Sequence, residues 1–241
     1  MTKMAFHVRR GIAASALLGF LGCGGDLTLP DTSGAGIQLR AVSGEVQGGM
    51  VGQPLPSPLV VEVTSESGVP ISGWAVAFVL STDSATGDLE PDTVVTNSRG
   101  EASSRWVLGS APGEYAAEAR LVATADEVPT VQFRASATPA EPDTIRAESR
   151  VSQPGFRAEP LPDPLVVQVV DRFGNPVPGA AVEWAVTVGE GTVSESATTA
   201  GADGRASVNW TLGDRIGVQR VTARAGEISG SPVTFSATVL F

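Results

Sequence analysis

Residues 202–213 read ADGRASVNWTLG, and the order of apolar and polar residues in this stretch indicates the fold class. Apolar residues at positions 206, 208, 210 and 212 alternate with Ser207, Asn209 and Thr211. A period of two places one set of side chains inside a sheet and the other in water, whereas a helix requires a period of about 3.6. Turn-forming residues precede the run. We therefore predict a β-strand with one buried face, entered through a tight turn.

The same alternation returns along the rest of the chain, in residues 102–108, 182–188 and 233–239. Turn-forming clusters separate these runs: GVPISG (68–73), NSRG (97–100) and GNPVPG (174–179). Roughly seven short strands per hundred residues, without a convincing helix, predict an all-β fold of antiparallel immunoglobulin-like sandwiches. Prolines that cannot donate to a ladder should form extended edge segments leading into the next strand: Pro54, Pro56, Pro58, Pro160, Pro162 and Pro164.

The chain is a duplication of one unit. Residues 38–80 align with residues 144–186 at an offset of 106 without a gap, and 18 of the 43 pairs are identical. Further on the offset falls to 104 and then to 102, where Phe133 meets Phe235. A repeat of about a hundred residues predicts two tandem domains, residues 37–138 and 142–241, with a short proline-bearing link between them.

Both copies, residues 37–138 and 142–241, resemble a known family, and the second carries the fuller motif. LVVQVVDRFGNPVPGAAVEW (165–184), a glycine-rich bend, ADGRASVNWTLG and the final VTFSAT are similar to the group 1 bacterial Ig-like domain repeated in the stalks of intimin and invasin adhesins. The first copy departs from this pattern at SESGVP (65–70), where the second has DRFGNP (171–176). The resemblance implies a rigid spacer or display module without catalytic residues. It does not extend to the membrane barrel or lectin-like domain of those adhesins, so we do not expect their receptor binding to transfer.

The first 22 residues predict a secretory signal. Basic residues are followed by the twelve apolar or small residues 11–22 and then by Cys23. Twelve helical residues span about 18 Å, too short for a hydrocarbon core of roughly 30 Å. The segment is therefore a signal peptide rather than a transmembrane anchor.

The segment GFLGC (19–23) resembles the lipobox of bacterial lipoproteins, which implies cleavage before Cys23 and acylation of its thiol. The alternative is an ordinary signal peptide with a chance cysteine. A lone cysteine in an exported chain cannot form an internal disulfide, which favours lipidation. Residues 23–36 then form a lipidated flexible tether, and Gly24 resembles the pattern that diderm cells forward to the outer membrane.

Cleavage after Gly22 would leave 26 acidic residues and 13 arginines, a formal charge of −13. Such a charge disfavours nucleic acid and anionic lipid head groups as partners. Lys3 and His7 are the only lysine and histidine and lie in the leader. The mature chain would thus lack Ser-His-Asp, Cys-His, Ser-Lys and His- or Cys-ligated zinc sites. No feature marks one carboxylate pair for glycoside hydrolysis, and we expect no enzyme and no cofactor.

Four aromatic residues lie at inward-facing strand positions, and we interpret them as core residues rather than as a surface on which sugars stack: Phe78, Trp106, Trp184 and Trp210. Trp74, whose counterpart is Ala180, has two possible interpretations: a surface contact or packing against a loop. Tyr115 is interpreted as a corner tyrosine that ties down a loop, although Gln219 replaces it in the second copy.

Acidic residues gather where the copies differ in length: Asp83, Asp88, Glu90 and Asp92. Whether this loop binds calcium or is simply solvated stays open, because the spacing is not that of an EF-hand. Three other aspartates are expected to accept backbone hydrogen bonds in turns: Asp171, Asp203 and Asp214. We predict no metal site.

These observations predict a non-enzymatic, lipid-anchored cell-envelope protein at the outer membrane. Its Ig-like domains would serve as a structural spacer or as an adhesion or display module. The alternative is a periplasm-facing module that binds a glycan or a protein, for instance by strand addition at a sheet edge. The sequence leaves open the ligand, the side of the membrane and the oligomeric state.

Overall fold

The computed structural model describes residues 36–81, 87–122 and 129–240. All secondary-structure elements within these ranges are β-strands. None of these residues forms a helix long and apolar enough to span a membrane. The all-β prediction is therefore confirmed.

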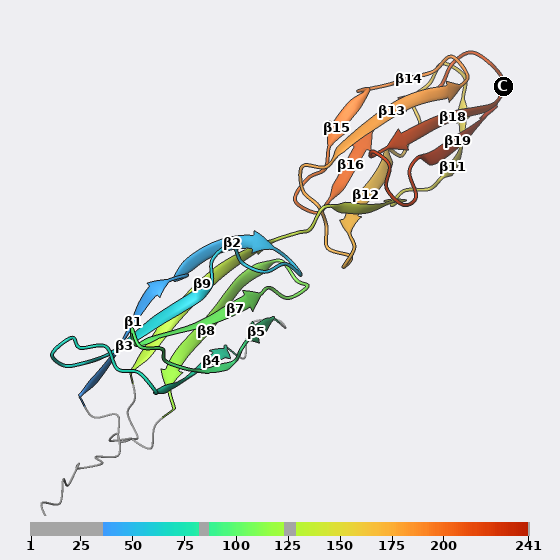
Figure 1. The fold of residues 1–241 in the computed structure, drawn as a ribbon. Coiled ribbons are helices and arrows are strands. Elements are labelled where there is room, and N and C mark those ends of the chain that lie inside the picture. Colours follow the sequence, from blue (N-terminus) through green and yellow to red (C-terminus); the bar gives the residue numbers. More distant parts are fainter. Residues whose placement is uncertain (1–35, 82–86, 123–128, 241) are drawn as a thin grey trace, which may run out of the picture. The chain divides into compact units, whose positions relative to one another are not determined.

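The first half of the described chain is a sandwich of two sheets (Figure 1, blue to yellow-green). Its strands are β1 (Ile37–Ser43), β2 (Val46–Met50), β3 (Leu59–Ser65), β4 (Ala75–Leu80), β5 (Asp88–Glu90), β6 (Thr93–Val95), β7 (Glu101–Val107), β8 (Gly113–Leu121) and β9 (Thr130–Thr138). One sheet has the order β1-β3-β7-β5 and the other β2-β9-β8-β4-β6. We call this half the first sandwich.

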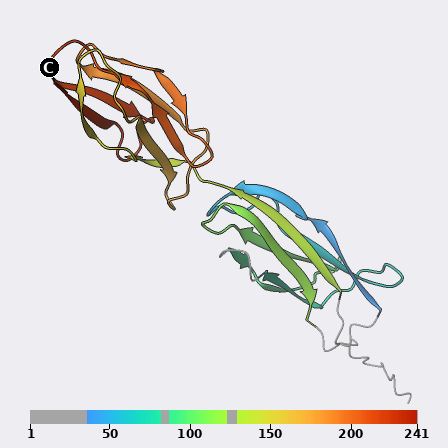
Figure 2. The same cartoon turned by 180° about the vertical axis from the view of Figure 1, so that it is seen from behind.

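The second half repeats the arrangement and is called the second sandwich. Its strands are β10 (Pro142–Ala147), β11 (Ser152–Phe156), β12 (Leu165–Asp171), β13 (Ala181–Val188), β14 (Thr192–Val193), β15 (Ala197–Thr199), β16 (Arg205–Val208), β17 (Trp210–Thr211), β18 (Gly217–Arg224) and β19 (Val233–Leu240). The sheets have the orders β10-β12-β16 and β11-β19-β18-β13-β15, with a separate β14-β17 pair. Figure 2 shows the layers of each half from behind.

The N-terminal segment of each sandwich forms two successive strands, and each of the two strands belongs to a different sheet. β1 and β10 pair antiparallel with β3 and β12, whereas β2 and β11 pair parallel with β9 and β19. The sequence predicted antiparallel pairing throughout, so these two parallel pairs are a difference from it. Side-chain alternation is the same beside a parallel and an antiparallel neighbour, and the pattern therefore could not reveal strand direction.

Each sandwich has its own hydrophobic cluster, and the two clusters share no residue. The predicted inward set of the first quoted stretch is buried: Ala206, Val208, Trp210 and Leu212. Ser207 and Asn209 between them are exposed. Because a buried aromatic ring hides about 150–250 Å², the largest single contributions come from the fully buried rings Trp106, Phe133, Trp210 and Phe235.

A glycine lies against the core tryptophan of each sandwich. A Cβ atom on Gly191 would lie 2.5 Å from the carbonyl oxygen of Thr211 and 2.9 Å from Nε1 of Trp210. A Cβ atom on Gly87 would lie 2.7 Å from the carbonyl oxygen of Val107. No side chain fits at either position, which explains why this glycine recurs in both copies.

The proline-rich segments lead into the next strand, as predicted, and Pro54 lies beside β7, an inner strand of its sheet. They make isolated bridges and then lead into β3 and β12: Pro54 with Val107, and Pro160 with Thr211. The side chain of Gln47 on β2 holds the first segment, because its Nε2 donates to the carbonyl of Ser57 at 3.0 Å and its Oε1 accepts the Ser57 N–H at 2.9 Å.

Candidate functional site

Two predicted sites lie wholly or partly outside the described residues. Cys23 is outside them, and so is Asp83 of the acidic loop. The other members of that loop, Asp88, Glu90 and Asp92, are exposed. No group of three or more His, Cys, Asp or Glu residues in the described part of the chain could hold a metal ion. The calcium alternative therefore has no ligand cluster there.

The aromatic residues considered for sugar stacking lie inside the sandwiches. Phe78, Trp106, Trp184 and Trp210 are all buried, and Trp184 packs on Phe235 with ring centroids 6.2 Å apart. Their assignment to the core is confirmed. Trp74 is buried too, and its backbone N–H donates to Oγ1 of Thr96 at 3.0 Å. This favours packing over a surface contact for Trp74.

Tyr115 is the corner tyrosine that the sequence predicted. Its hydroxyl donates to the carbonyl of Ala111 at 2.6 Å. In the second sandwich the fully buried Gln219 has the same task. Its Oε1 accepts the Gly213 N–H at 2.9 Å, and its Nε2 donates to the carbonyls of Gly213 and Arg215 at 3.0 and 2.9 Å. Two different side chains thus fasten the loop before the equivalent strands β8 and β18.

Two of the three turn aspartates behave as predicted. Oδ1 of Asp203 accepts the Arg205 N–H at 3.1 Å, and Oδ1 of Asp171 accepts the N–H groups of Phe173 and Asn175 at 2.9 Å. The prediction is wrong for Asp214, which is exposed and makes no such bond with the described residues. Its side chain extends into solvent and caps no turn.

The second carboxylate oxygen of Asp171 binds the link between the sandwiches. Oδ2 accepts the backbone N–H of Ala140 at 3.0 Å and the side-chain amide of Asn175 at 2.9 Å. The carboxylate is buried and receives four hydrogen bonds. Because a buried carboxylate is stable only when it is well bonded, these donors keep Asp171 ionised at the end of β12.

The pKa of Asp171 reflects this balance. Burial raises the pKa of the carboxyl, but hydrogen bonds from the Asn175 side chain and from the N–H groups of Ala140, Asn175 and Phe173 outweigh burial. The pKa of Asp171 therefore lies below its ordinary value.

The loop 171–176 also reaches the first sandwich, within the same compact unit of the chain. Nδ2 of Asn175 donates to the carbonyl of Ser110 at 2.7 Å. The ring of Phe173 lies against Gly52 and is covered by Arg172, whose Cζ is 4.7 Å from the ring centroid. We call this set of contacts the junction. The sequence signal for it was the difference between DRFGNP and SESGVP, but a single chain could not show which partner those residues meet.

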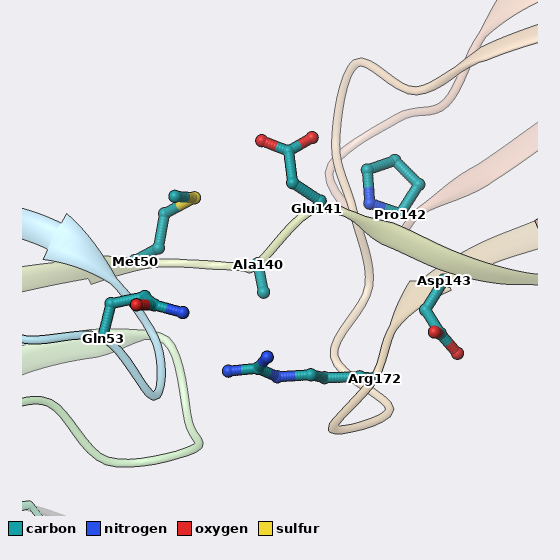
Figure 3. Close-up of a pocket in the computed structure, with 7 residues that line it drawn as sticks. All are labelled: Met50, Gln53, Ala140, Glu141, Pro142, Asp143 and Arg172. Atoms are coloured by element: carbon teal, nitrogen blue, oxygen red, sulfur yellow. The ribbon is translucent and has the colours of Figure 1, made fainter.

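A small open pocket lies beside the link (Figure 3). Its volume is about 200 Å³, and its lining residues are Met50, Gln53, Ala140, Glu141, Pro142, Asp143 and Arg172. Arg172 extends toward Gln53 beneath Ala140, whereas the carboxylates of Glu141 and Asp143 point away from them. The lining has no histidine, cysteine, serine or lysine that could act as a nucleophile with a neighbouring base. The pocket is a notch beside the link.

Residues 163–238 match the sequence model of the bacterial Ig-like domain (group 1). The match lies within the second sandwich and covers most of it. This confirms the family resemblance inferred from DRFGNP and ADGRASVNWTLG. In the second sandwich, the junction loop DRFGNP (171–176) stands where the first copy has SESGVP (65–70), and its Asn175 donates to the carbonyl of Ser110.

The chain also matches solved structures at low identity. The D00-D0 domain of intimin is 13% identical, with a TM-score of 0.43, and the match covers 85% of this chain and all of that one. The Escherichia coli adhesin FdeC is 15% identical, with a TM-score of 0.45, over 86% of this chain and 65% of that one. Domains 4 and 5 of the S-layer protein SbsC are 16% identical, with a TM-score of 0.38, over 85% and 98%. No curated protein matches the chain.

Proposed function

We propose that the chain is a non-enzymatic, lipid-anchored protein of the bacterial cell envelope. Its two tandem Ig-like domains, residues 37–138 and 142–241, act as a spacer or as an adhesion or display module. Cys23 would carry the lipid, and residues 23–36 would be the tether. The proposal includes no nucleic-acid partner and no cofactor.

The observation that carries the spacer role is the hydrogen-bonded junction. A spacer must transmit position from one module to the next, so its link has to be held rather than free. Here a buried carboxylate of one sandwich binds the link N–H, and Asn175 of the same loop binds a carbonyl of the other sandwich. The group 1 family match supports the adhesion or display role.

Lipid anchoring is tested by metabolic labelling with a radioactive fatty acid. The parent chain should incorporate label and fractionate with membranes, and Cys23→Ser should lose both. Thr28→Ser in the predicted tether is the matched control and should keep both. An unlabelled parent chain would overturn the anchoring part of the proposal.

The direction in which the domains face is tested by protease shaving of intact cells. We expect the parent chain to be degraded, as a surface-exposed module should be. Survival in intact cells, with degradation after the outer membrane is opened, would instead favour the periplasm-facing binding module. A glycan array probed with the purified chain then tests whether a sugar is the ligand.

A further inference from the structure

The strands β11, β18 and β19 lie side by side in the second sandwich (Figure 1), and exposed apolar side chains gather at one end of them. These side chains belong to Phe156, Ile216, Val218 and Leu240, with 54%, 46%, 49% and 44% of their surface exposed. Phe156 is the register partner of Leu240, and Val218 is the partner of Thr238, two residues earlier on the same face. We call these four side chains the tip patch. Contiguous exposed apolar groups of this kind are typical of contact sites.

The equivalent end of the first sandwich already contacts a β-sandwich. The repeat offsets place Met50, Pro112, Glu114 and Thr138 at the positions of the tip patch. In that same end, Gly52 meets Phe173 and the carbonyl of Ser110 accepts Asn175. This end of the repeated unit is therefore suited to another β-sandwich as its neighbour.

A further sandwich could not bind this end of the second sandwich through the contacts that form the junction. Ala158 takes the place of Gly52 and has φ 57, so the turn is the same as that of Gly52, with φ 68. A Cβ at Gly52 would lie 2.5 Å from Cζ of Phe173, and Ala158 has such a Cβ. The contact that Phe173 makes in the junction is therefore blocked at the tip, and the partner must approach differently.

Charged residues of both signs surround the tip patch. Arg157, Glu159, Asp214 and Arg215 are exposed, and none forms an ion pair with another described residue. The first copy has uncharged residues at these positions: Val51, Gln53, Ser110 and Ala111. Two positive and two negative groups give no net attraction to an anionic membrane. They do allow opposite charges to meet when the same surface faces itself.

We propose that the tip patch is a contact between two copies of this chain, related by a two-fold axis. The four apolar side chains form its centre, and the two arginines of each copy pair with the acidic residues of the other at the rim. Four side chains cover less than the roughly 800 Å² per partner of a standard interface, so association is weak in dilute solution. Association is strengthened when the copies share one membrane, which rests on the proposed lipid anchor.

The test uses the full chain in membranes of cells that produce it, with Thr238→Cys beside the tip patch, at the register partner of Val218. The matched control is Thr234→Cys, which lies four residues away, about 13 Å along the same strand and on the same face. Both variants retain Cys23, so the difference between them depends only on the second thiol. A short bismaleimide should give a covalent dimer with Thr238→Cys several-fold above the level with Thr234→Cys. Adding Phe156→Asp or Leu240→Asp should abolish that excess, whereas Val95→Asp, an exposed valine of the first sandwich, should leave it.

Equal cross-linking at positions 238 and 234 would overturn the proposal, since random collision produces that result. A Thr238→Cys chain that stays monomeric while its thiol reacts freely with a monofunctional maleimide would overturn it as well. A thiol at 238 that is shielded in cells but gives no dimer would show that a different partner covers the patch. Fatty-acid labelling separates these outcomes from a failure of lipid anchoring.

Discussion

Phe173 of the second sandwich lies against Gly52 of the first so closely that a Cβ on Gly52 would be 2.5 Å from Cζ of its ring. Gly52 has φ 68, and its repeat equivalent Ala158 adopts nearly the same left-handed conformation with φ 57. The turn itself therefore tolerates a methyl group. Glycine is needed at position 52 because of the ring that lies on it.

Gly52→Ala should consequently destabilise the junction. Overpacking of this kind costs about 1–3 kcal/mol, because the Phe173 ring must move away from the turn. Phe173→Ala should relieve the clash, so the double variant should be more stable than the sum of the single changes predicts. Equilibrium denaturation of the four chains measures the coupling.

The control for Gly52→Ala is the reverse change at the equivalent turn. Ala158→Gly removes a side chain that touches no neighbouring sandwich, so its free energy of unfolding should change by less than about 1 kcal/mol. Additive effects of Gly52→Ala and Phe173→Ala would show that the ring does not rest on this turn.

Asp171 should be more important than its position in a turn suggests. Asp171→Asn keeps the shape but replaces one acceptor oxygen with a donor, and therefore leaves either the loop N–H groups of Phe173 and Asn175 or the link N–H of Ala140 without an acceptor. We expect a loss of about 1–3 kcal/mol in the free energy of unfolding. Asp203→Asn is the matched control, because Asp203 is exposed and accepts a single backbone N–H. Equal effects of the two changes would contradict a special role for Asp171.

The ionisation of Asp171 also predicts a dependence on pH. Its pKa in the folded chain is lowered, because hydrogen bonds to the carboxylate outweigh the effect of burial. A lowered folded pKa gives stability that is fully present above the unfolded value of about 3.9 and is lost as the pH falls through the folded value. The stability gap between the parent and Asp171→Asn should be constant near neutrality and narrow below about pH 3.9. Chemical denaturation across that pH range measures the stability difference between the two chains. A difference that widens in acid would contradict a lowered pKa of Asp171 in the folded chain.

Side-chain alternation predicted the sandwiches well, because burial on a pleated strand depends only on a period of two. The inward residues around Trp106 and Trp210 are all buried as expected. Strand direction was beyond this pattern, and β2 and β11 pair parallel with their neighbours. The internal repeat helped further, since aligning the copies showed which glycines and prolines the fold requires.

The junction was less accessible to sequence reasoning. Asp171 was correctly predicted to accept backbone hydrogen bonds in a turn. One of its oxygens serves the loop, but the partner of the other is set by tertiary structure. Asp214 was also predicted to accept a backbone hydrogen bond in a turn, but its exposed side chain makes no hydrogen bond with the described residues. Local sequence therefore gives the capacity to accept a bond without giving the donor.

Trp210→Ala should be the most damaging single change in the second sandwich. The indole is fully buried in a core without disulfides, so its removal should cost about 3–5 kcal/mol. Melting followed by circular dichroism should show one sandwich unfolding at a lower temperature. Val95→Ala, which removes an exposed side chain of the first sandwich, should leave the melt within experimental error. A Trp210→Ala chain that melts with the parent would show that the ring is not in the core.

Gln219 provides a test of whether two different side chains perform one task in the two copies. Gln219→Ala would leave the N–H and carbonyl of Gly213 and the carbonyl of Arg215 without their partner in a buried loop, at a cost of about 1–3 kcal/mol. Tyr115→Phe in the first sandwich removes only the bond to Ala111 and keeps the ring, so its cost should be about 0.5–1.5 kcal/mol. Hydrogen exchange should locate the effect of Gln219→Ala in residues 213–219 while β13 stays protected, because the other contacts of the core are unchanged. If protection were lost uniformly across the second sandwich, Gln219 would be acting as core packing rather than as a fastening for this loop.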